Sequence, residues 1–215
     1  MSTVIDAILA TKIVAIVRLE RYDRAVEITR ALLAGGISVV EFTLTGAGAY
    51  EAIAATRAAL GDAAHIGVGT VLNVDTAEAA IDAGAQFVVT PTTSPAVIRA
   101  CVARGTPILS GALTPTEALT AHEAGASMVK LFPARFGGPQ YLRDILAPLP
   151  FLRIVPTGGV GAENARAYID AGAVAVGIGG SLITAQAVAQ ADWGRITAGA
   201  RAVVEAIKAA TLGVE

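Results

Sequence analysis

The chain has 215 residues, of which 54% are hydrophobic and 16% are charged, and its formal net charge at pH 7 is −2. This composition excludes an intrinsically disordered chain, and the frequent Gly, Pro and charged residues exclude a membrane-spanning segment. The balance of 16 basic and 18 acidic residues provides no basic surface for nucleic acid. We therefore expect a single globular domain over residues 1–215 that acts on a small molecule.

Cysteine and histidine usage argues against metal chemistry. The single cysteine, Cys101, excludes an intramolecular disulfide, and His65 and His122 lie far apart with no cysteine companion, unlike the common zinc patterns. We expect no metal site and no cofactor. Residues 1–12 lack the basic start and long apolar stretch of a secretion signal, so a cytoplasmic location is expected.

Eight short runs rich in β-branched residues recur at intervals of about 20 to 27 residues, the length that one strand, one helix and two tight loops require. The runs span residues 13–17, 38–42, 65–69, 86–90, 106–109, 128–132, 153–156 and 174–178. Alanine-rich segments with helical spacing lie between them, for example at 22–33, 75–83, 115–124 and 162–171. A final helix is expected at about 192–210.

The repeated strand–helix pattern predicts a parallel sheet. Glycines follow several helical segments, at the position where a left-handed residue ends a helix: Gly35, Gly84, Gly125 and Gly172. Strands that are apolar at nearly every residue are buried on both faces, and eight such units close naturally into a (β/α)8 TIM barrel. An open doubly wound sheet is the alternative, but eight units exceed its usual six strands.

Strand position singles out one of the three lysines. Lys12 precedes the first strand and Lys208 lies on the final helix, whereas Lys130 interrupts an apolar run in the sixth strand. Burial of an unpaired ammonium is costly and favours the neutral, nucleophilic amine. Glu41 is the acid inside the second strand, and both strands can direct side chains into the barrel. The two residues are either a nucleophile with its proton shuttle or a structural ion pair.

Other polar residues follow strand ends, where the active sites of barrels lie. Arg18 could bind a carboxylate through its planar guanidinium, or be a surface cation. Thr70 could donate a hydrogen bond to the same carboxylate, or it could have only a structural role in a turn. Glycine pairs follow the seventh and eighth strands, at 158–159 and 179–180, where barrels of this kind commonly bind phosphate.

Five motifs in order along the chain resemble those of the 2-keto-3-deoxy-6-phosphogluconate (KDPG)/4-hydroxy-2-oxoglutarate (KHG) aldolase family. They read Gly-Val-Gly-Thr-Val-Leu-Asn at 67–73, Leu-Thr-Pro-Thr-Glu at 113–117, Val-Lys-Leu-Phe-Pro-Ala at 129–134, Pro-Thr-Gly-Gly-Val at 156–160 and Gly-Gly-Ser at 179–181. The resemblance extends from residue 13 to about residue 182 and surrounds the lysine and the glutamate placed inside strands.

The resemblance implies a metal-free class I aldolase, usually a homotrimer, that cleaves a 2-keto-3-deoxy-6-phospho sugar acid or KHG to pyruvate and an aldehyde. It assigns Lys130 as the Schiff-base residue, Glu41 as general acid and base, and Thr70 to the carboxylate of the keto acid. Exposed apolar residues such as Phe136, Tyr141 and Trp193 are candidates for a subunit interface. The substrate-binding candidates are Arg18, Thr70, Pro91, Phe132, Thr157, Gly158, Gly159, Gly179, Gly180 and Ser181.

One departure from the family concerns the carboxylate end. Many members carry an arginine after the second strand where this chain has Thr45, and Arg18 is the available substitute. The residues leave open the gluconate or galactonate configuration of the substrate and its phosphorylation. They also leave a second hypothesis, a phosphate-binding isomerase or synthase in which Lys130 acts without a covalent intermediate.

Overall fold

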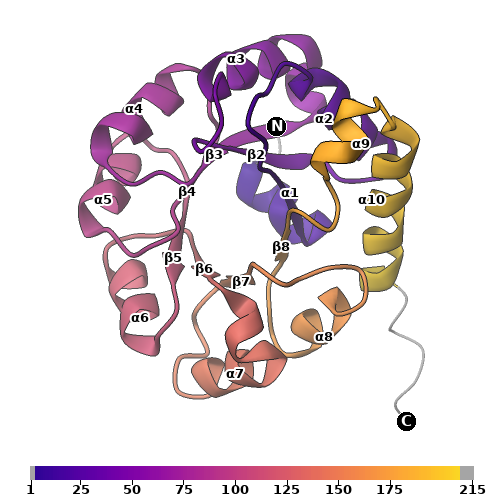
Figure 1. The fold of residues 1–215 in the computed structure, drawn as a ribbon. Helices are drawn as coiled ribbons and strands as arrows, with labels where there is room; N and C mark the ends of the chain where they lie inside the picture. The colour runs from indigo at the N-terminus through magenta and orange to yellow at the C-terminus, as the bar shows by residue number, and fades with distance from the viewer. Residues whose placement is uncertain (1–2, 209–215) are drawn as a thin grey trace.

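The computed structural model describes residues 3–208, which form a ring of eight parallel strands surrounded by helices (Figure 1). The strands follow the order β7-β6-β5-β4-β3-β2-β1-β8, and a parallel bridge between Thr157 and Gly177 joins the two ends. The predicted (β/α)8 barrel is therefore confirmed, and an open sheet is wrong. The strands are β1 (Ile13–Val17), β2 (Val39–Thr43), β3 (His65–Gly69), β4 (Val88–Val89), β5 (Ile108–Ala112), β6 (Met128–Leu131), β7 (Ile154–Pro156) and β8 (Val176–Ile178).

Helices alternate with the strands and cover the outside of the barrel (Figure 1). They are α1 (Val4–Thr11), α2 (Ala25–Ala34), α3 (Ala49–Leu60), η1 (Gly61–Ala63), α4 (Val74–Asp82), α5 (Pro95–Ala103), α6 (Pro115–Glu123), η2 (Ala134–Phe136), α7 (Gly138–Leu146), α8 (Ala165–Asp170), α9 (Ala185–Ala189) and α10 (Trp193–Lys208). The final helix predicted at 192–210 is α10, and residues 209–210 lie outside the described part. Within residues 3–208, none of the helices is long and apolar enough to cross a membrane.

Strand boundaries agree with the sequence at both ends of β1 and β3, whereas β5 is displaced. The predicted run at 106–109 becomes Ile108–Ala112, so Ser110 and Gly111 lie within the strand rather than in the loop after it. Pro107 lacks an N–H for the ladder, which favours a strand that starts after it. Ser110 and Gly111 are residue types that are common in turns. All of β5 is buried, however, and this tertiary burial overrides their local preference for a turn.

The predicted left-handed conformation is wrong for one of the four glycines. The conformation is found, with φ between 101° and 104°, at Gly84, Gly125 and Gly172. Gly35 instead keeps φ −91°, and the next residue, Gly36, takes φ 93°. A Cβ built on Gly35 would overlap the Cβ of Ala200 on α10 and lie 2.7 Å from the backbone oxygen of Thr197. Gly35 thus serves the close packing of α10 on α2 rather than the turn.

The side chains that fill the barrel interior determine which end is free for chemistry. Val4 and Ile8 of α1 pack with apolar residues from the strands, among them Phe87, Leu109 and Met128, in one buried cluster. In Figure 1, α1 lies across the far end of the barrel, behind the strands. The pattern of apolar runs in the sequence does not indicate this helix. Because α1 closes the end where the strands begin, the polar side chains gather where the strands end.

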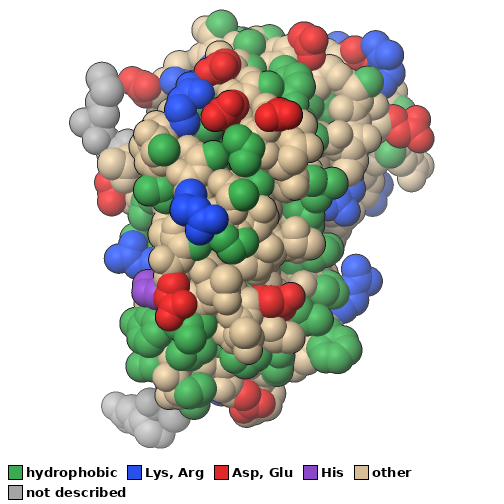
Figure 2. Space-filling model, turned by 90° about the vertical axis from the view of Figure 1, so that its left-hand side faces the viewer, with side chains coloured by type: hydrophobic (Ala, Val, Ile, Leu, Met, Phe, Trp, Pro, Cys, Tyr) green, Lys and Arg blue, Asp and Glu red, His purple; other side chains and the backbone are tan. Residues whose placement is uncertain are grey.

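A second and larger core lies between the strands and the outer helices, and alanines form much of it. Small side chains let these helices approach the strands closely. From the side, the outer surface shows apolar atoms interspersed with charged side chains (Figure 2). Large apolar side chains that remain exposed include Phe136, whose exposed fraction is 74%. Tyr141 and Trp193, expected to be exposed, are instead half-buried against this core.

Candidate active site

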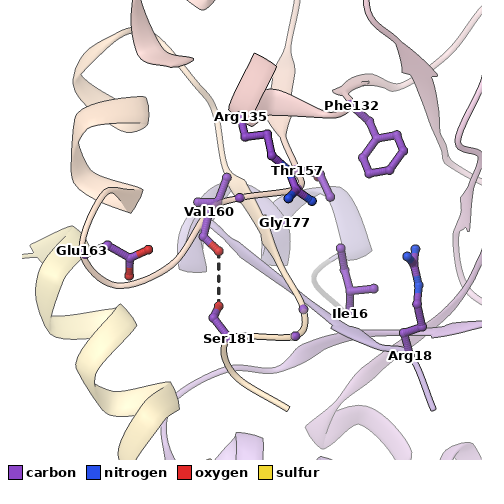
Figure 3. Close-up of a pocket in the computed structure, with 13 residues that line it drawn as sticks. Ile16, Arg18, Phe132, Arg135, Thr157, Val160, Glu163, Gly177 and Ser181 are labelled. Carbon is purple, nitrogen blue, oxygen red and sulfur yellow. Dashed lines mark hydrogen bonds between the residues drawn. The ribbon is translucent and has the colours of Figure 1, made fainter. Parts of the chain in front are cut away.

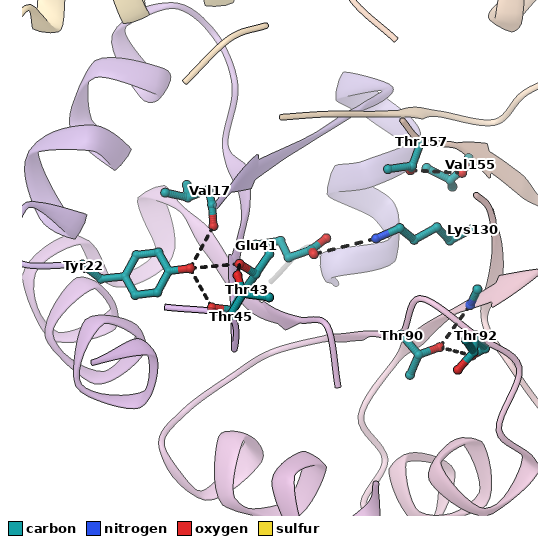
Figure 4. A network of polar contacts seen from close by, with 11 residues as sticks. Val17, Tyr22, Glu41, Thr43, Thr45, Thr90, Thr92, Lys130, Val155 and Thr157 are labelled. Atoms are coloured by element: carbon teal, nitrogen blue, oxygen red, sulfur yellow. Dashed lines mark hydrogen bonds and ion pairs between the residues drawn. The ribbon is translucent and has the colours of Figure 1, made fainter. Parts of the chain in front are cut away.

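Lys130 and Glu41 meet inside the barrel. Lys130 lies on β6, in register with Gly111 of β5 and Val155 of β7, and Glu41 lies on β2, in register with Ile16 of β1. Their side chains extend toward each other across the interior (Figure 4), and Lys130 Nζ lies 3.9 Å from Glu41 Oε1. Both residues are buried, with exposed fractions of 3% and 1%. The closed sheet thus brings together a base and an acid that are 89 residues apart in the sequence.

Glycines make room for this pair. A Cβ built on Gly69, at the end of β3, would overlap the carboxylate of Glu41 and lie 2.6 Å from its Cγ. The same test on Gly111, the register partner of Lys130, gives an overlap with the backbone of Pro91 and a distance of 2.5 Å to the backbone nitrogen of Thr92. Neither glycine has a left-handed φ, so the backbone conformation does not require glycine at these positions. Glycine is required because neighbouring atoms occupy the space that a Cβ would take.

The surroundings of Glu41 favour its protonated form. Burial raises the pKa of the Glu41 carboxyl above its ordinary value of 4.5, while the positive charges of Lys130 and Arg18 oppose this shift. Within the described residues, Glu41 Oε1 has no hydrogen-bond partner. The 3.9 Å separation from Lys130 Nζ is too long for a hydrogen bond, so the carboxyl is free to exchange a proton with a bound molecule.

A cavity of about 440 Å³, within the range typical of ligand sites, opens at the strand ends next to this pair (Figure 3). The ring of Phe132, whose centroid is 5.4 Å from Lys130 Nζ, and Ile16, the register partner of Glu41, connect the pair to the cavity. Eight of the ten substrate-binding candidates line it: Arg18, Phe132, Thr157, Gly158, Gly159, Gly179, Gly180 and Ser181.

Thr70 and Pro91 do not line this cavity. Thr70 directly follows Gly69 and has φ 62°, a left-handed value that turns the chain after β3. Pro91 lies against Gly111, so both residues border the Lys130–Glu41 pair rather than the glycine-rich loops. The sequence predicts that they follow strand ends, but it cannot place each strand end relative to the cavity.

Five residues that line the cavity are not among the candidates that the sequence indicates: Ile16, Arg135, Val160, Glu163 and Gly177. Ile16 and Gly177 carry no chemical signal, because apolar residues and glycine are expected in buried strands. Arg135 and Glu163 are charged residues on the loops after β6 and β7, so the rule that chemistry lies on such loops would have found them.

Thr45 stands where the family resemblance leads us to expect an arginine, and it is tied into a local network (Figure 4). Thr45 Oγ1 lies 2.8 Å from Thr43 Oγ1, and the Tyr22 hydroxyl donates to the Thr43 carbonyl oxygen at 2.6 Å. Arg18 is exposed, and among the described residues no hydrogen bond or ion pair of its side chain is found. The guanidinium available at this end of the cavity is therefore that of Arg18.

The described residues contain no group of three or more His, Cys, Asp or Glu side chains placed to hold a metal ion. A lysine and a glutamate in contact, next to a cavity lined by glycine loops, can form and protonate a covalent imine with a carbonyl compound.

Several known proteins resemble this chain over most of its length. The family model described as KDPG and KHG aldolase matches residues 4–199. A 2-dehydro-3-deoxy-phosphogluconate aldolase of Treponema pallidum is 39% identical over 199 residues, which cover 92% of this chain and 94% of that protein. A 2-dehydro-3-deoxy-6-phosphogalactonate aldolase of Escherichia coli is 38% identical and covers 80% of this chain and 85% of its own length.

Solved structures show the same likeness. A structure of native KDPGal superposes with a TM-score of 0.85 at 36% identity, covering 92% of this chain and 94% of the other. KDPG aldolase of Legionella pneumophila, with pyruvate captured as a covalent carbinolamine, has a TM-score of 0.84 at 27% identity and covers 92% and 96% of the two chains.

Proposed function

The chain belongs to the KDPG and KHG aldolase family, and from this premise we propose that it is a class I aldolase with Lys130 as the Schiff-base residue. Its substrate is a 2-keto-3-deoxy-6-phospho sugar acid, of gluconate or galactonate configuration, or KHG. The products are pyruvate and glyceraldehyde 3-phosphate or, from KHG, glyoxylate. The observation that carries the proposal is the buried contact of Lys130 Nζ with Glu41 Oε1 at 3.9 Å, beside the cavity.

The reaction follows from this pair. The neutral amine of Lys130 adds to the C2 ketone, Glu41 donates a proton to the carbinolamine oxygen, and water leaves to give a protonated imine. Glu41, now a carboxylate, takes the proton of the C4 hydroxyl, and the C3–C4 bond breaks with its electron pair moving into the imine. The aldehyde departs. The enamine gains a proton at C3, and water hydrolyses the imine to release pyruvate and regenerate the amine.

The raised pKa of Glu41 suits this double duty, because the carboxyl keeps its proton available for donation at higher pH and is a stronger base once that proton has left. We assign Arg18 and Thr70 to the carboxylate of the substrate. Gly159, Gly180 and Ser181 lie at the phosphate end. The Ser181 hydroxyl donates to the Val160 carbonyl oxygen at 3.4 Å, which joins the two glycine-rich loops.

Trapping with pyruvate tests the proposal directly. Incubation with pyruvate and borohydride should leave a reduced pyruvate adduct on the peptide that contains Lys130 and abolish activity. Lys130→Met should give no adduct and no pyruvate release, whereas Lys12→Met, a surface control, should behave as the unmodified enzyme. An unlabelled protein, or full activity of Lys130→Met, contradicts the covalent mechanism. Such a result would favour the alternative hypothesis of a non-covalent isomerase or synthase, which the relatives do not favour.

We also propose that the 215 residues form one domain, that the enzyme assembles as a homotrimer and that it acts in the cytoplasm. The exposed ring of Phe136 supports an interface, and a relative 36% identical to this chain forms part of a cage designed from symmetric oligomeric domains. Light scattering should give three times the mass of the chain. The cytoplasm is where charged sugar-acid phosphates, which do not cross membranes unaided, are available, and cell fractionation tests this location.

A further inference from the structure

Arg135 lies in the cavity without a role in the chemistry described above. It belongs to η2, the next element after β6, and lines the cavity together with Gly158 and Gly159 of the loop after β7. Within residues 3–208, no hydrogen bond or ion pair of its guanidinium is found, although other exposed arginines, such as Arg21 and Arg104, pair with aspartates. A free guanidinium over glycine backbone is suited to an anion.

The backbone holds Arg135 in a fixed position relative to the glycine-rich loop. The amide N–H of Ala134 donates to the Thr157 carbonyl oxygen at 2.8 Å, and that of Arg135 donates to the Gly158 carbonyl oxygen at 2.9 Å. A Cβ built on Gly159 would lie 2.6 Å from the Cβ of Arg135, so the stem of the arginine packs where a side chain at Gly159 would be. The backbone and the stem of Arg135 are thus part of the cavity wall, and its guanidinium extends from that wall.

The charges around the cavity match a molecule that is anionic at both ends. Figure 3 shows Arg135 and Arg18 extending into the cavity from opposite sides, one from η2 and the other from the end of β1. Glu163 is the acidic residue of the lining, and its carboxylate lies against Gly161, at the edge remote from Arg18. A phosphorylated keto sugar acid carries a carboxylate at C1 and a phosphate at C6, one for each arginine.

We propose that Arg135 is a specificity-determining residue that binds the terminal phosphate, so that the enzyme favours phosphorylated over unphosphorylated 2-keto-3-deoxy sugar acids. The inference rests on the proposed function, since it takes Lys130 as the residue that holds the keto end. Arginine suits this role because its planar fork donates two parallel hydrogen bonds to phosphate oxygens. The phosphate is the second anionic group of the substrate, and an unphosphorylated substrate lacks it.

Steady-state kinetics with KDPG and with its unphosphorylated counterpart, 2-keto-3-deoxygluconate, test this role. Arg135→Gln should raise KM for the phosphorylated substrate about tenfold, as expected for loss of a charged hydrogen bond, while kcat changes little. For the unphosphorylated substrate, kcat/KM should stay within about threefold, because the lost contact is absent there. Arg135→Lys should recover part of the affinity for the phosphorylated substrate. High salt should reduce the difference in KM between the unmodified enzyme and Arg135→Gln, because it screens the charge of the arginine.

Arg153→Gln is the matched control. It removes the same charge from an exposed arginine that precedes β7, at the opposite end of that strand from the cavity, and should leave both substrates unaffected. An equal loss for both substrates, or no loss for either, overturns the role of Arg135. Pyruvate has no phosphate, so its trapping on Lys130 should proceed in Arg135→Gln. A failure of that trapping in the unmodified enzyme would instead overturn the proposed aldolase mechanism.

Discussion

Replacing Gly69 by alanine tests whether the position of the Glu41 carboxylate matters for catalysis. The added Cβ would overlap the carboxylate and lie 2.6 Å from Glu41 Cγ, whereas ordinary contact begins at about 3.4 Å. Cγ must therefore move by about 0.8 Å and the carboxylate by more. Because a displacement of about 1 Å can cost about a hundredfold in rate, we expect kcat to fall by roughly this factor.

Gly67→Ala provides the control on the same strand. Its Cβ would lie 2.5 Å from the ring of Phe87, and the three atoms nearest to it all belong to that ring rather than to Glu41. Both variants overpack the interior, which typically costs about 1 to 3 kcal/mol of stability, so both should unfold at lower urea concentration. Only Gly69→Ala should lose pyruvate release, measured at a temperature where both remain folded. Turnover of folded Gly69→Ala at the rate of the Gly67→Ala control would refute the proposed role of the Glu41 carboxylate.

Three further predictions concern stability and reactivity. Burial raises the pKa of the Cys101 thiol to about 11, so a disulfide reagent at pH 8 should label it only as fast as the protein unfolds; rapid labelling of the native protein contradicts this. Folded Glu41 keeps its proton above pH 4.5, where the unfolded chain releases it, so stability falls as pH rises through this range. In urea titrations, the free energy of unfolding should fall less steeply with pH in Glu41→Gln and more steeply in Lys130→Met, which lacks the opposing charge. The same pH dependence in both variants and the unmodified protein would argue against a raised pKa of Glu41. Thr114 caps α6 by accepting from the Glu117 amide, so Thr114→Ala should lower the free energy of unfolding by about 1 kcal/mol, and Thr116→Ala, one residue inside the helix start, should not.

The sequence by itself determined the fold and the reacting pair. Eight evenly spaced apolar runs separated by helical segments have one compact solution, a closed parallel barrel, because strands buried on both faces need helices all around. A charged residue inside such a strand has few explanations. For this reason Lys130 and Glu41 could be selected before their 3.9 Å contact was known.

Only the tertiary structure decided which neighbours complete the site. The roles of Gly69 and Gly35 depend on what occupies the space beside them, namely the Glu41 carboxylate and α10, and no local pattern records this. The sequence does place Arg135 after a strand, where chemistry is expected, but it does not show which segments surround this residue. Arg135 becomes a wall of the cavity because η2 bonds to the loop after β7, a contact between segments that are adjacent only once β6 and β7 pair.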